Sequence, residues 1–161
     1  WGTWGMQFTD QEQDKVTLDY RTEYDEPTGE HVLMITRMDD QFLLTNHRQR
    51  GIEFPGGKRE AGESSKDAMA RELFEETGGK VKDAQYIAQY VVHRTNGQPF
   101  SKDVYFVEVD ELCNKQDYLE TKGPVFYQYL DDIPEEQKSY LLRDAAILHC
   151  VERVKDLGLY S

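Results

Sequence analysis

The sequence contains little cysteine and no long hydrophobic run, and both shortages limit what the protein can be. Its two cysteines, Cys113 and Cys150, lie far apart, and its four histidines form no metal-binding pattern. These absences argue against a disulfide framework and against a zinc site, and they predict a reducing compartment, the cytoplasm. No apolar run reaches the roughly 20 residues that cross a bilayer, and no signal peptide is visible, so no membrane partner is expected.

Basic residues are also scarce. There are 19 Lys and Arg against 31 Asp and Glu, which gives a formal net charge of -12 at pH 7. This charge argues against broad, non-specific binding to nucleic acid or to an anionic membrane. Anionic substrates are still compatible with it, because bound divalent metal ions reverse the sign of the charge locally.

Length and composition predict a single domain. The 161 residues are 38% hydrophobic and 12% aromatic, which suits one globular domain with one hydrophobic core over residues 1–161. Because the chain begins with Trp1 rather than Met, residues 1–5 are expected to be a trimmed, added or disordered segment. We leave them out of the functional interpretation. Nothing in the sequence points to an oligomeric state.

The hydrophobic pattern predicts strands on both sides of one helix and a second helix at the end. The expected strands are a hairpin at 31–37 and 41–47, an extended piece at 51–57, and strands at 84–93, 103–109 and 124–130. A helix is expected from its N-cap, Ser64, to Gly78, a glycine at the usual C-terminal position. Apolar residues at helical spacing predict a second helix over 136–157, ended by Gly158. This order implies a mixed α/β sandwich, with helices packed on a mixed sheet.

The stretch 71–78, Arg-Glu-Leu-Phe-Glu-Glu-Thr-Gly, gathers three carboxylates on one side of the first helix. At about 100° per residue, they fall within one arc roughly 100° wide. The three are Glu72, Glu75 and Glu76. The apolar back is expected from Ala70, Leu73, Phe74 and Thr77. Such a face is either an ordinary solvated surface or the holder of a hard cation such as Mg²⁺, which prefers carboxylates together with substrate phosphates. The Gly-rich loop before the helix favours the second alternative, because its backbone can turn toward a bound ion or phosphate.

The residues around this helix resemble a known signature. From Gly57 the sequence reads glycine, five residues, Glu63, seven residues, and then the stretch 71–78. This resembles the Nudix hydrolase signature G-x5-E-x7-R-E-U-x-E-E-x-G-U, where U is a bulky aliphatic residue. Every fixed polar and glycine position matches. The last U is Gly79 here, and Val81 is expected to supply the missing packing.

The resemblance implies an α/β/α sandwich of the Nudix type. It also implies that a Mg²⁺- or Mn²⁺-dependent enzyme cleaves a diphosphate linkage by attack of water, without a covalent intermediate. The flanking stretches 50–58 and 118–127 are similar to the YtkD-type subgroup of bacterial Nudix proteins. That subgroup is associated with hydrolysis of nucleoside triphosphates, including oxidised guanine nucleotides, and with removal of pyrophosphate from RNA 5′ ends.

The resemblance further implies roles for individual residues. The implied metal ligands are Glu72 and Glu76 directly, Glu75 directly or through water, and the carbonyl of Gly56. Arg71 is expected to orient the carboxylates, and Glu63 to bond to Arg71 or to a metal-bound water, or simply to be an acid at the helix entry. Glu120, in a late loop, is a candidate metal ligand and shares with Glu72 the candidacy for the general base, with an ordinary loop acid as its alternative.

Cationic residues also collect around the Gly-rich loop, despite the net negative charge. They are His47, Arg48, Arg50, Lys58 and Arg59. This cluster is either a site for the distal phosphates of a substrate or a solvated strand edge. The candidates for stacking on a base are Phe54, Tyr90 and Tyr127, each of which also suits the core.

The sequence therefore predicts a pyrophosphohydrolase of nucleoside triphosphates or other nucleoside diphosphate-linked substrates, with guanine nucleotides such as 8-oxo-dGTP preferred. The first alternative is an RNA 5′-pyrophosphohydrolase. The second is a Nudix module that senses nucleotides without turning them over.

Overall fold

The structure, a computed structural model, describes residues 5–161. Its strands are β1 (Gly5–Thr9), β2 (Lys15–Tyr20), β3 (His31–Met38), β4 (Gln41–His47), β5 (Gly51–Glu53), β6 (Gly56–Lys58), β7 (Gly79–His93), β8 (Phe100–Leu112) and β9 (Thr121–Tyr127). Its helices are α1 (Ser65–Thr77) and α2 (Ala145–Asp156), with short 3-10 turns at Leu130–Asp132, Glu135–Gln137 and Tyr140–Arg143. Of the segment 1–5 set aside above, Gly5 begins β1, and residues 1–4 lie outside the described residues.

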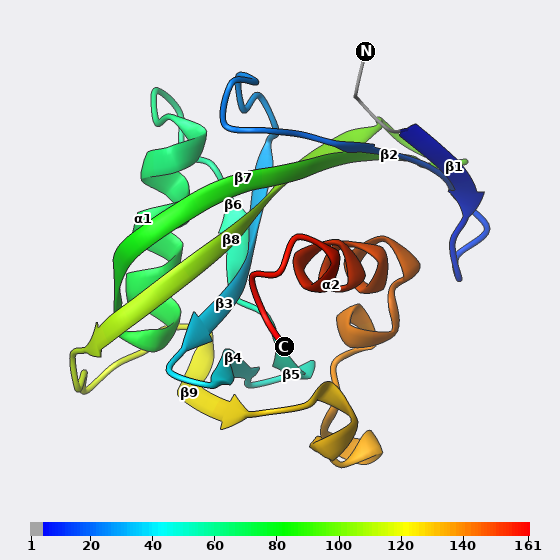
Figure 1. Ribbon diagram of the computed structural model, residues 1–161. Coiled ribbons are helices and arrows are strands. Elements are labelled where there is room, and N and C mark those ends of the chain that lie inside the picture. The colour runs from blue at the N-terminus through cyan, green and yellow to red at the C-terminus, as the bar shows by residue number, and fades with distance from the viewer. Residues whose placement is uncertain (1–4) are drawn as a thin grey trace.

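The strands form one mixed sheet of nine strands in the order β1-β2-β7-β8-β3-β4-β5, with β6 beside β3 and β9 beside β4. Strands β3 and β8 run parallel, whereas β7 and β8 form a long antiparallel pair. Helices α1 and α2 lie on opposite sides of this sheet (Figure 1). The expected Nudix-type α/β/α sandwich is therefore confirmed.

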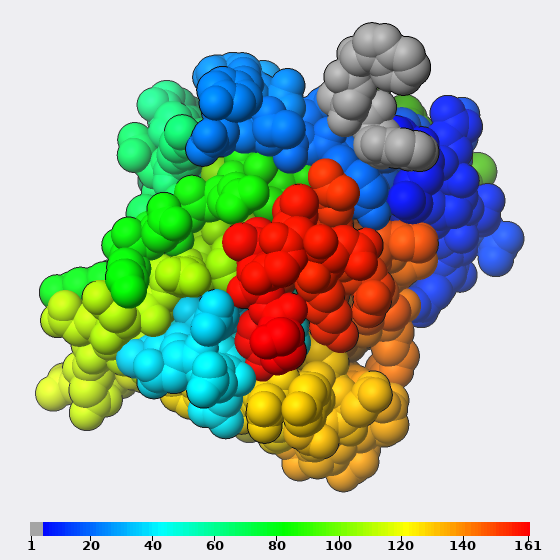
Figure 2. Space-filling model, viewed as in Figure 1, coloured from blue at the N-terminus to red at the C-terminus, as the bar shows by residue number. Residues whose placement is uncertain are grey.

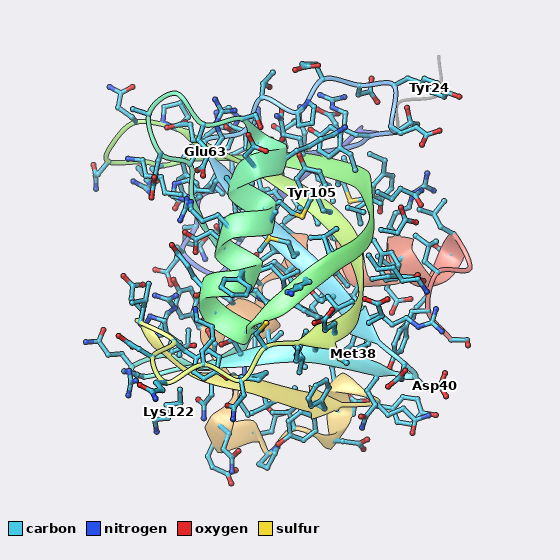
Figure 3. The ribbon with its side chains drawn as sticks, turned by 90° about the vertical axis from the view of Figure 1, so that its left-hand side faces the viewer. Tyr24, Met38, Asp40, Glu63, Tyr105 and Lys122 are labelled. Carbon is cyan, nitrogen blue, oxygen red and sulfur yellow. The ribbon has the colours of Figure 1, made fainter. Side chains whose placement is uncertain are left out.

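Each helix covers its own layer of buried side chains. Under α1 these include Met34, Leu73 and Tyr105. Under α2 they include Ile35 and Val151. In the space-filling view, α2 and the C-terminal residues cover the middle of one face (Figure 2). In the perpendicular view, α1 lies across the strands, with Glu63 beside its N-terminal end (Figure 3). The interpretation of residues 1–161 as one domain stays a prediction.

The local signals around α1 predict its two ends correctly. Ser64 is the N-cap, and its hydroxyl accepts a hydrogen bond from the backbone amide of Asp67 at 3.1 Å. Gly78 ends the helix in the left-handed conformation, with φ at 76°. A side chain at this position would also collide with the carbonyl of Cys113, so the position requires glycine.

The expected apolar back of α1 was partly wrong. Phe74 is 38% exposed, and the Lys115 ammonium lies 4.8 Å from its ring centroid. Ala70 is also exposed, whereas Ala68 and Met69 are buried in the α1 layer. Leu73 and Thr77 are buried as expected, so Ala70 and Phe74 are the two residues that were placed wrongly.

The packing expected from Val81 was also wrong. Val81 is 36% exposed, so it does not replace the aliphatic residue of the signature. A side-chain atom on Gly79 would come within 3.4 Å of both Leu73 and Val109, which already fill the space at the end of α1. A small residue at 79 is therefore what the packing of this chain requires.

The second helix is shorter than expected. The prediction placed it over 136–157, but α2 begins at Ala145, and Asp144 caps it by accepting from the amide of Ala146 at 3.1 Å. The residues before it pair with the sheet instead, and the Ser139 amide donates to the Ile52 carbonyl at 2.9 Å. Strands β1 and β2 were not predicted. Their sequence signal is a short alternation of apolar with polar residues, through Met6 and Phe8 in β1 and through the fully buried Val16 and Leu18 in β2.

Candidate active site

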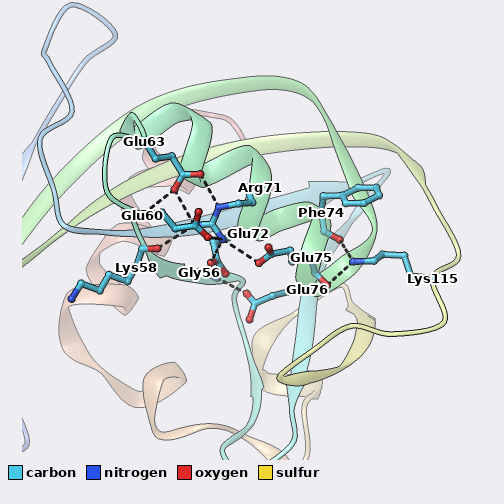
Figure 4. Close-up of polar contacts among 10 residues, drawn as sticks. All are labelled: Gly56, Lys58, Glu60, Glu63, Arg71, Glu72, Phe74, Glu75, Glu76 and Lys115. Carbon is cyan, nitrogen blue, oxygen red and sulfur yellow. Dashed lines mark hydrogen bonds and ion pairs between the residues drawn. The ribbon is translucent and has the colours of Figure 1, made fainter.

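Arg71 lies at the centre of the acidic face of α1 (Figure 4). Its guanidinium forms a two-pronged bond to Glu63, with Nε and Nη2 at 2.7 and 2.9 Å from the carboxylate oxygens. The same group donates to Glu72 at 2.7 Å and to Glu75 at 3.1 Å. Glu60, which the sequence interpretation missed, lies 3.5 Å away. One arginine thus holds several carboxylates that would otherwise repel one another.

The spacing of the helix explains this arrangement. Residues four apart lie on the same face, so Arg71 meets Glu75, and Glu72 meets Glu76. Glu63 reaches the group from the loop that enters the helix. Because it is so strongly bonded to Arg71, its pKa is lowered from 4.5 to about 2. It therefore stays ionised over the whole physiological range.

Glu76 stands in a different environment from Glu63. It is 7% exposed, and its Oε1 accepts a hydrogen bond from the Gly56 amide at 2.9 Å. Burial raises its pKa from 4.5 to about 8. Burial also raises the pKa of Glu72, although its bond to Arg71 opposes the shift. Of these three acids, Glu63 is therefore always charged, whereas a charge on Glu72 or Glu76 is costly without a cation nearby.

Two glycines let β6 approach the acidic face closely. A side-chain atom on Gly57 would collide with the carboxylate of Glu72. One on Gly56 would collide with the backbone carbonyl of Val32 on the neighbouring strand. The Pro55 carbonyl accepts from the Met34 amide at 2.9 Å, which fixes the approach of this segment to β3. The Gly-rich loop therefore forms the wall opposite α1.

The donor set around this wall fits a hard divalent cation. A cavity of about 400 Å³ is lined by Arg50, Lys58 and Arg71 and also by Glu60, Glu72, Glu75, Glu76, Glu120 and Gly56, whose oxygens are the donors that such a cation prefers. Over residues 5–161, no three acids, histidines or cysteines are already arranged to hold a metal ion. In this structure the carboxylates are bonded to Arg71 and to the Gly56 amide instead. Each of Glu72, Glu75 and Glu76 uses one carboxylate oxygen in these bonds, which leaves its other oxygen to face a cation.

A second cavity adjoins the first across β6. It has a volume of about 320 Å³, and the two cavities share Arg50, Gly56, Gly57 and Lys58 as a wall. Its other cationic lining residues are Arg94 and Lys102, and His31 lines it as well. Glu53 is also present, but Arg50 binds it with two hydrogen bonds of 2.9 and 2.8 Å. An acidic cavity therefore lies beside a cationic one.

The four predicted phosphate-binding residues do not all line the same cavity. Arg50 and Lys58 lie in the shared wall. Arg48 lies in another cavity beside Glu120, and its Nε donates to the Leu119 carbonyl at 3.1 Å. Arg59 lines a separate cavity between the loop over 23–28 and the start of α1. The structure therefore brings two of these four residues to the shared wall.

The predicted stacking residues lie mostly in the core. Phe54 and Tyr90 are 2% and 1% exposed, and Tyr127 packs against the core under α2. Phe54 still contributes an edge to the cationic cavity. The aromatic residue that the sequence interpretation missed is Phe100, which lies 4.2 Å from the Arg94 guanidinium. Glu120 is 82% exposed at its side chain and lies 3.9 Å from His47.

Comparison with known proteins agrees with this geometry. Residues 27–138 match the NUDIX domain. The chain is 35% identical over 154 residues to YtkD of Bacillus subtilis, provisionally named an 8-oxo-dGTP diphosphatase, and the match covers 94% of this chain and 97% of YtkD. No helix within residues 5–161 has the length and apolar character needed to cross a membrane.

Solved structures give the same result. The crystal structure of the Bacillus subtilis pyrophosphohydrolase BsRppH, in a mutant form, matches with a TM-score of 0.86 at 33% identity. That match covers 97% of this chain and 99% of the other. A NUDIX hydrolase from Nitrosomonas europaea matches with a TM-score of 0.65 at 22% identity over 83% of this chain and 93% of that one, which shows a shared fold.

Proposed function

This chain belongs to the Nudix hydrolase family, whose members act on pyrophosphate bonds, and we propose that it is a divalent-metal-dependent enzyme acting on guanine nucleoside triphosphates such as 8-oxo-dGTP. Its relatives of similar length are named a diphosphatase and a pyrophosphohydrolase. The proposal adds to the family assignment the use of a divalent metal ion and the choice of a guanine nucleotide as substrate.

The observation that carries the proposal is the shared wall of the two cavities. A nucleotide polyphosphate is anionic along one end and aromatic at the other. The acidic cavity suits that anionic end only if cations are bound there, because Glu72, Glu75 and Glu76 would otherwise repel it. Arg50 and Lys58 lie between that cavity and the next, where they can contact phosphates directly.

The residues of α1 and β6 have distinct tasks in this proposal. Glu72, Glu75, Glu76 and the Gly56 carbonyl would hold Mg²⁺ or Mn²⁺, and Glu120 would join them from its loop. Such an ion neutralises phosphate charge and makes a bound water more acidic. Arg71 fixes the directions of the carboxylates and touches no substrate.

Proton removal from the attacking water falls to a carboxylate within reach of it. Glu72 and Glu120 are the candidates. Glu72 is held firmly by Arg71, and its raised pKa brings it closer to the pH at which a base works well. Glu120 is far more exposed, and its carboxylate lies 3.9 Å from the His47 ring, which is beyond hydrogen-bond distance. Replacing each with glutamine and comparing the pH profiles would separate the two.

An RNA 5′ end is the second candidate substrate, and the cationic cavity favours it. Arg94, Lys102 and His31 lie beyond the shared wall, on the side away from the acids. A mononucleotide has no phosphate to place there, whereas a second nucleotide does. The net charge of -12 works against long RNA, so any contact would be limited to the first nucleotides.

The deciding experiment is product analysis with Mg²⁺ and with Mn²⁺ on GTP, 8-oxo-dGTP, a dinucleoside polyphosphate and triphosphorylated RNA. Glu76→Gln is the inactive control, and Glu152→Gln, on the exposed side of α2, is the matched neutral control. Preferred turnover of a guanine nucleotide, lost only in Glu76→Gln, supports the proposal. Turnover of RNA alone supports the second candidate. Nucleotide binding that survives EDTA without phosphate release would instead indicate a sensing module.

A further inference from the structure

The alternation of residues along β8 places a lysine on the core side of the sheet. Val104 and Phe106 belong to the buried layer under α2, so the residue two positions earlier, Lys102, faces the same side. Its cross-strand neighbours are His31 on β3 and Tyr90 on β7. A charged residue on the core-facing side of a strand is uncommon. Lys102 lies at the border between the apolar layer under α2 and the cationic cavity.

Within residues 5–161, the Lys102 ammonium makes no hydrogen bond or ion pair. Burial lowers its pKa, and the nearest opposite charges are those of Asp144 and Glu53. Both of these acids are engaged elsewhere, Glu53 by Arg50 and Asp144 as the cap of α2. The nearest aromatic face is that of Tyr90, with the ammonium 5.8 Å from the ring centroid. The ammonium is therefore a partly buried donor in need of an acceptor.

The walls around Lys102 suit a flat aromatic group. Phe54 and Phe100 line the cavity, and the ring of His31 meets that of Phe100 edge to face, with centroids 5.5 Å apart. Burial and the neighbouring charge of Lys102 lower the pKa of His31, so its imidazole stays neutral. A base can enter between such groups, with its phosphates directed toward the shared wall.

We propose that Lys102 determines base specificity, by donating a hydrogen bond to the 6-oxo group of a purine that occupies the cationic cavity. An ammonium group can only donate. At position 6 guanine presents an acceptor, O6, whereas adenine presents an amino donor, and this is the difference that a donor at Lys102 can read. Lys102 therefore selects guanine-type bases against adenine. This inference rests on the proposed function, because it assumes a nucleotide substrate at the neighbouring acids.

The test compares GTP with 2-aminopurine riboside triphosphate, whose base keeps the 2-amino group but lacks the 6-oxo group and the N1 proton that accompanies it. For the unaltered protein, kcat/KM is expected to be roughly 10- to 100-fold higher for GTP. In Lys102→Met the two values should become about equal, mainly through loss on GTP. Lys102→Gln, which keeps a donor, should retain part of the preference. Lys82→Met, at an exposed lysine of β7, should leave the ratio unchanged.

An unchanged ratio of kcat/KM values in Lys102→Met, including one in which both values fall by the same factor, would overturn the inference. Lys102 would then be assigned to phosphate binding or to packing.

If RNA alone is turned over, the same 6-oxo replacement is made in turn in its first two nucleotides. If nothing is turned over, the proposed function has failed. The ratio of the two nucleotides' equilibrium dissociation constants, measured in the presence of Ca²⁺, then replaces the ratio of kcat/KM values. A preference for GTP that Lys102→Met removes supports the role of Lys102, and a preference that persists overturns it.

Discussion

The Oε1 atom of Glu76 accepts a hydrogen bond from the backbone amide of Gly56 at 2.9 Å, which ties the end of α1 to the start of β6. The backbone carbonyl of Glu76 is also fixed, because the hydroxyls of Thr45 and Thr121 donate to it at 3.0 and 3.2 Å. Both the carboxylate and the backbone carbonyl of Glu76 are therefore hydrogen-bonded to strands. These bonds fix the position of the carboxylate beside the Gly-rich loop.

The raised pKa of Glu76 predicts how the metal-free protein responds to pH. Its pKa is 4.5 in the unfolded chain and about 8 in the folded one. Between these values the folded protein holds a proton that the unfolded chain has released, so stability falls as pH rises. Thermal melts in EDTA from about pH 5 to about pH 8 should show this decline, and Glu76→Gln should weaken it.

The metal supplies the complementary measurement. A cation that binds the Glu76 carboxylate displaces its proton, so Mn²⁺ should stabilise the protein more at about pH 8 than at about pH 6. Glu63 cannot produce this trend, because its pKa of about 2 leaves it ionised throughout. A melting temperature independent of pH in EDTA, with no difference in Glu76→Gln, would contradict the assignment.

Arg71→Lys tests whether the arginine positions the carboxylates. A lysine keeps the charge, but it cannot form the two-pronged bond to Glu63 while also reaching Glu72 and Glu75. We expect kcat to fall roughly 10- to 100-fold, with weaker metal binding and a retained fold. Arg143→Lys is the matched control, because Arg143 pairs with Glu135 on the surface. Equal activity of both variants would show that Arg71 is only a surface charge partner.

Asp103 supports α1 from beneath the helix. It is fully buried and accepts hydrogen bonds from the Ser65 hydroxyl at 2.6 Å, the Gly29 amide at 2.7 Å and the Tyr86 hydroxyl at 2.8 Å. Asp103→Ala would remove the acceptor that these buried donors share and leave Ser65 with the Tyr105 hydroxyl alone, so the free energy of unfolding should fall by about 3 kcal/mol. Urea unfolding measures this loss. Asp110→Ala, at an exposed acid on the same strand, should change it by less than about 0.5 kcal/mol.

The sequence predicts α1 and its acids well because their signals are local. The cap at Ser64, the glycine at 78 and the carboxylates at helical spacing all lie within the one segment 64–78. The hydrophobic pattern of the sequence predicts burial wrongly where tertiary packing decides which side chains are covered. Phe74 is apolar and suits the buried side of the helix, yet it is exposed and lies beside Lys115.

The cationic cavity could not be predicted from the sequence, because it depends on which strands pair. His31 becomes the neighbour of Lys102 only through the parallel pairing of β3 with β8, and Tyr90 through the pairing of β7 with β8. These pairings join residues far apart in the chain. Proximity to the Gly-rich loop in sequence favoured Arg59 instead, which the fold turns toward a different cavity.

Gly57→Ala tests the close approach of β6 to α1. The added methyl group would collide with the carboxylate of Glu72, which is the flexible end of a side chain and can move aside. We therefore expect a stability change below about 1 kcal/mol but a fall in kcat of roughly 10- to 100-fold, because the displaced acid is proposed to hold the metal. Gly62→Ala, in the same loop, is the control. Among the described residues its methyl group meets no neighbour within 4 Å, although its φ of 80° strains an alanine, so it should lose some stability and keep its activity. If Gly57→Ala keeps full activity, Glu72 does not need its present position, and its assignment as a metal ligand fails.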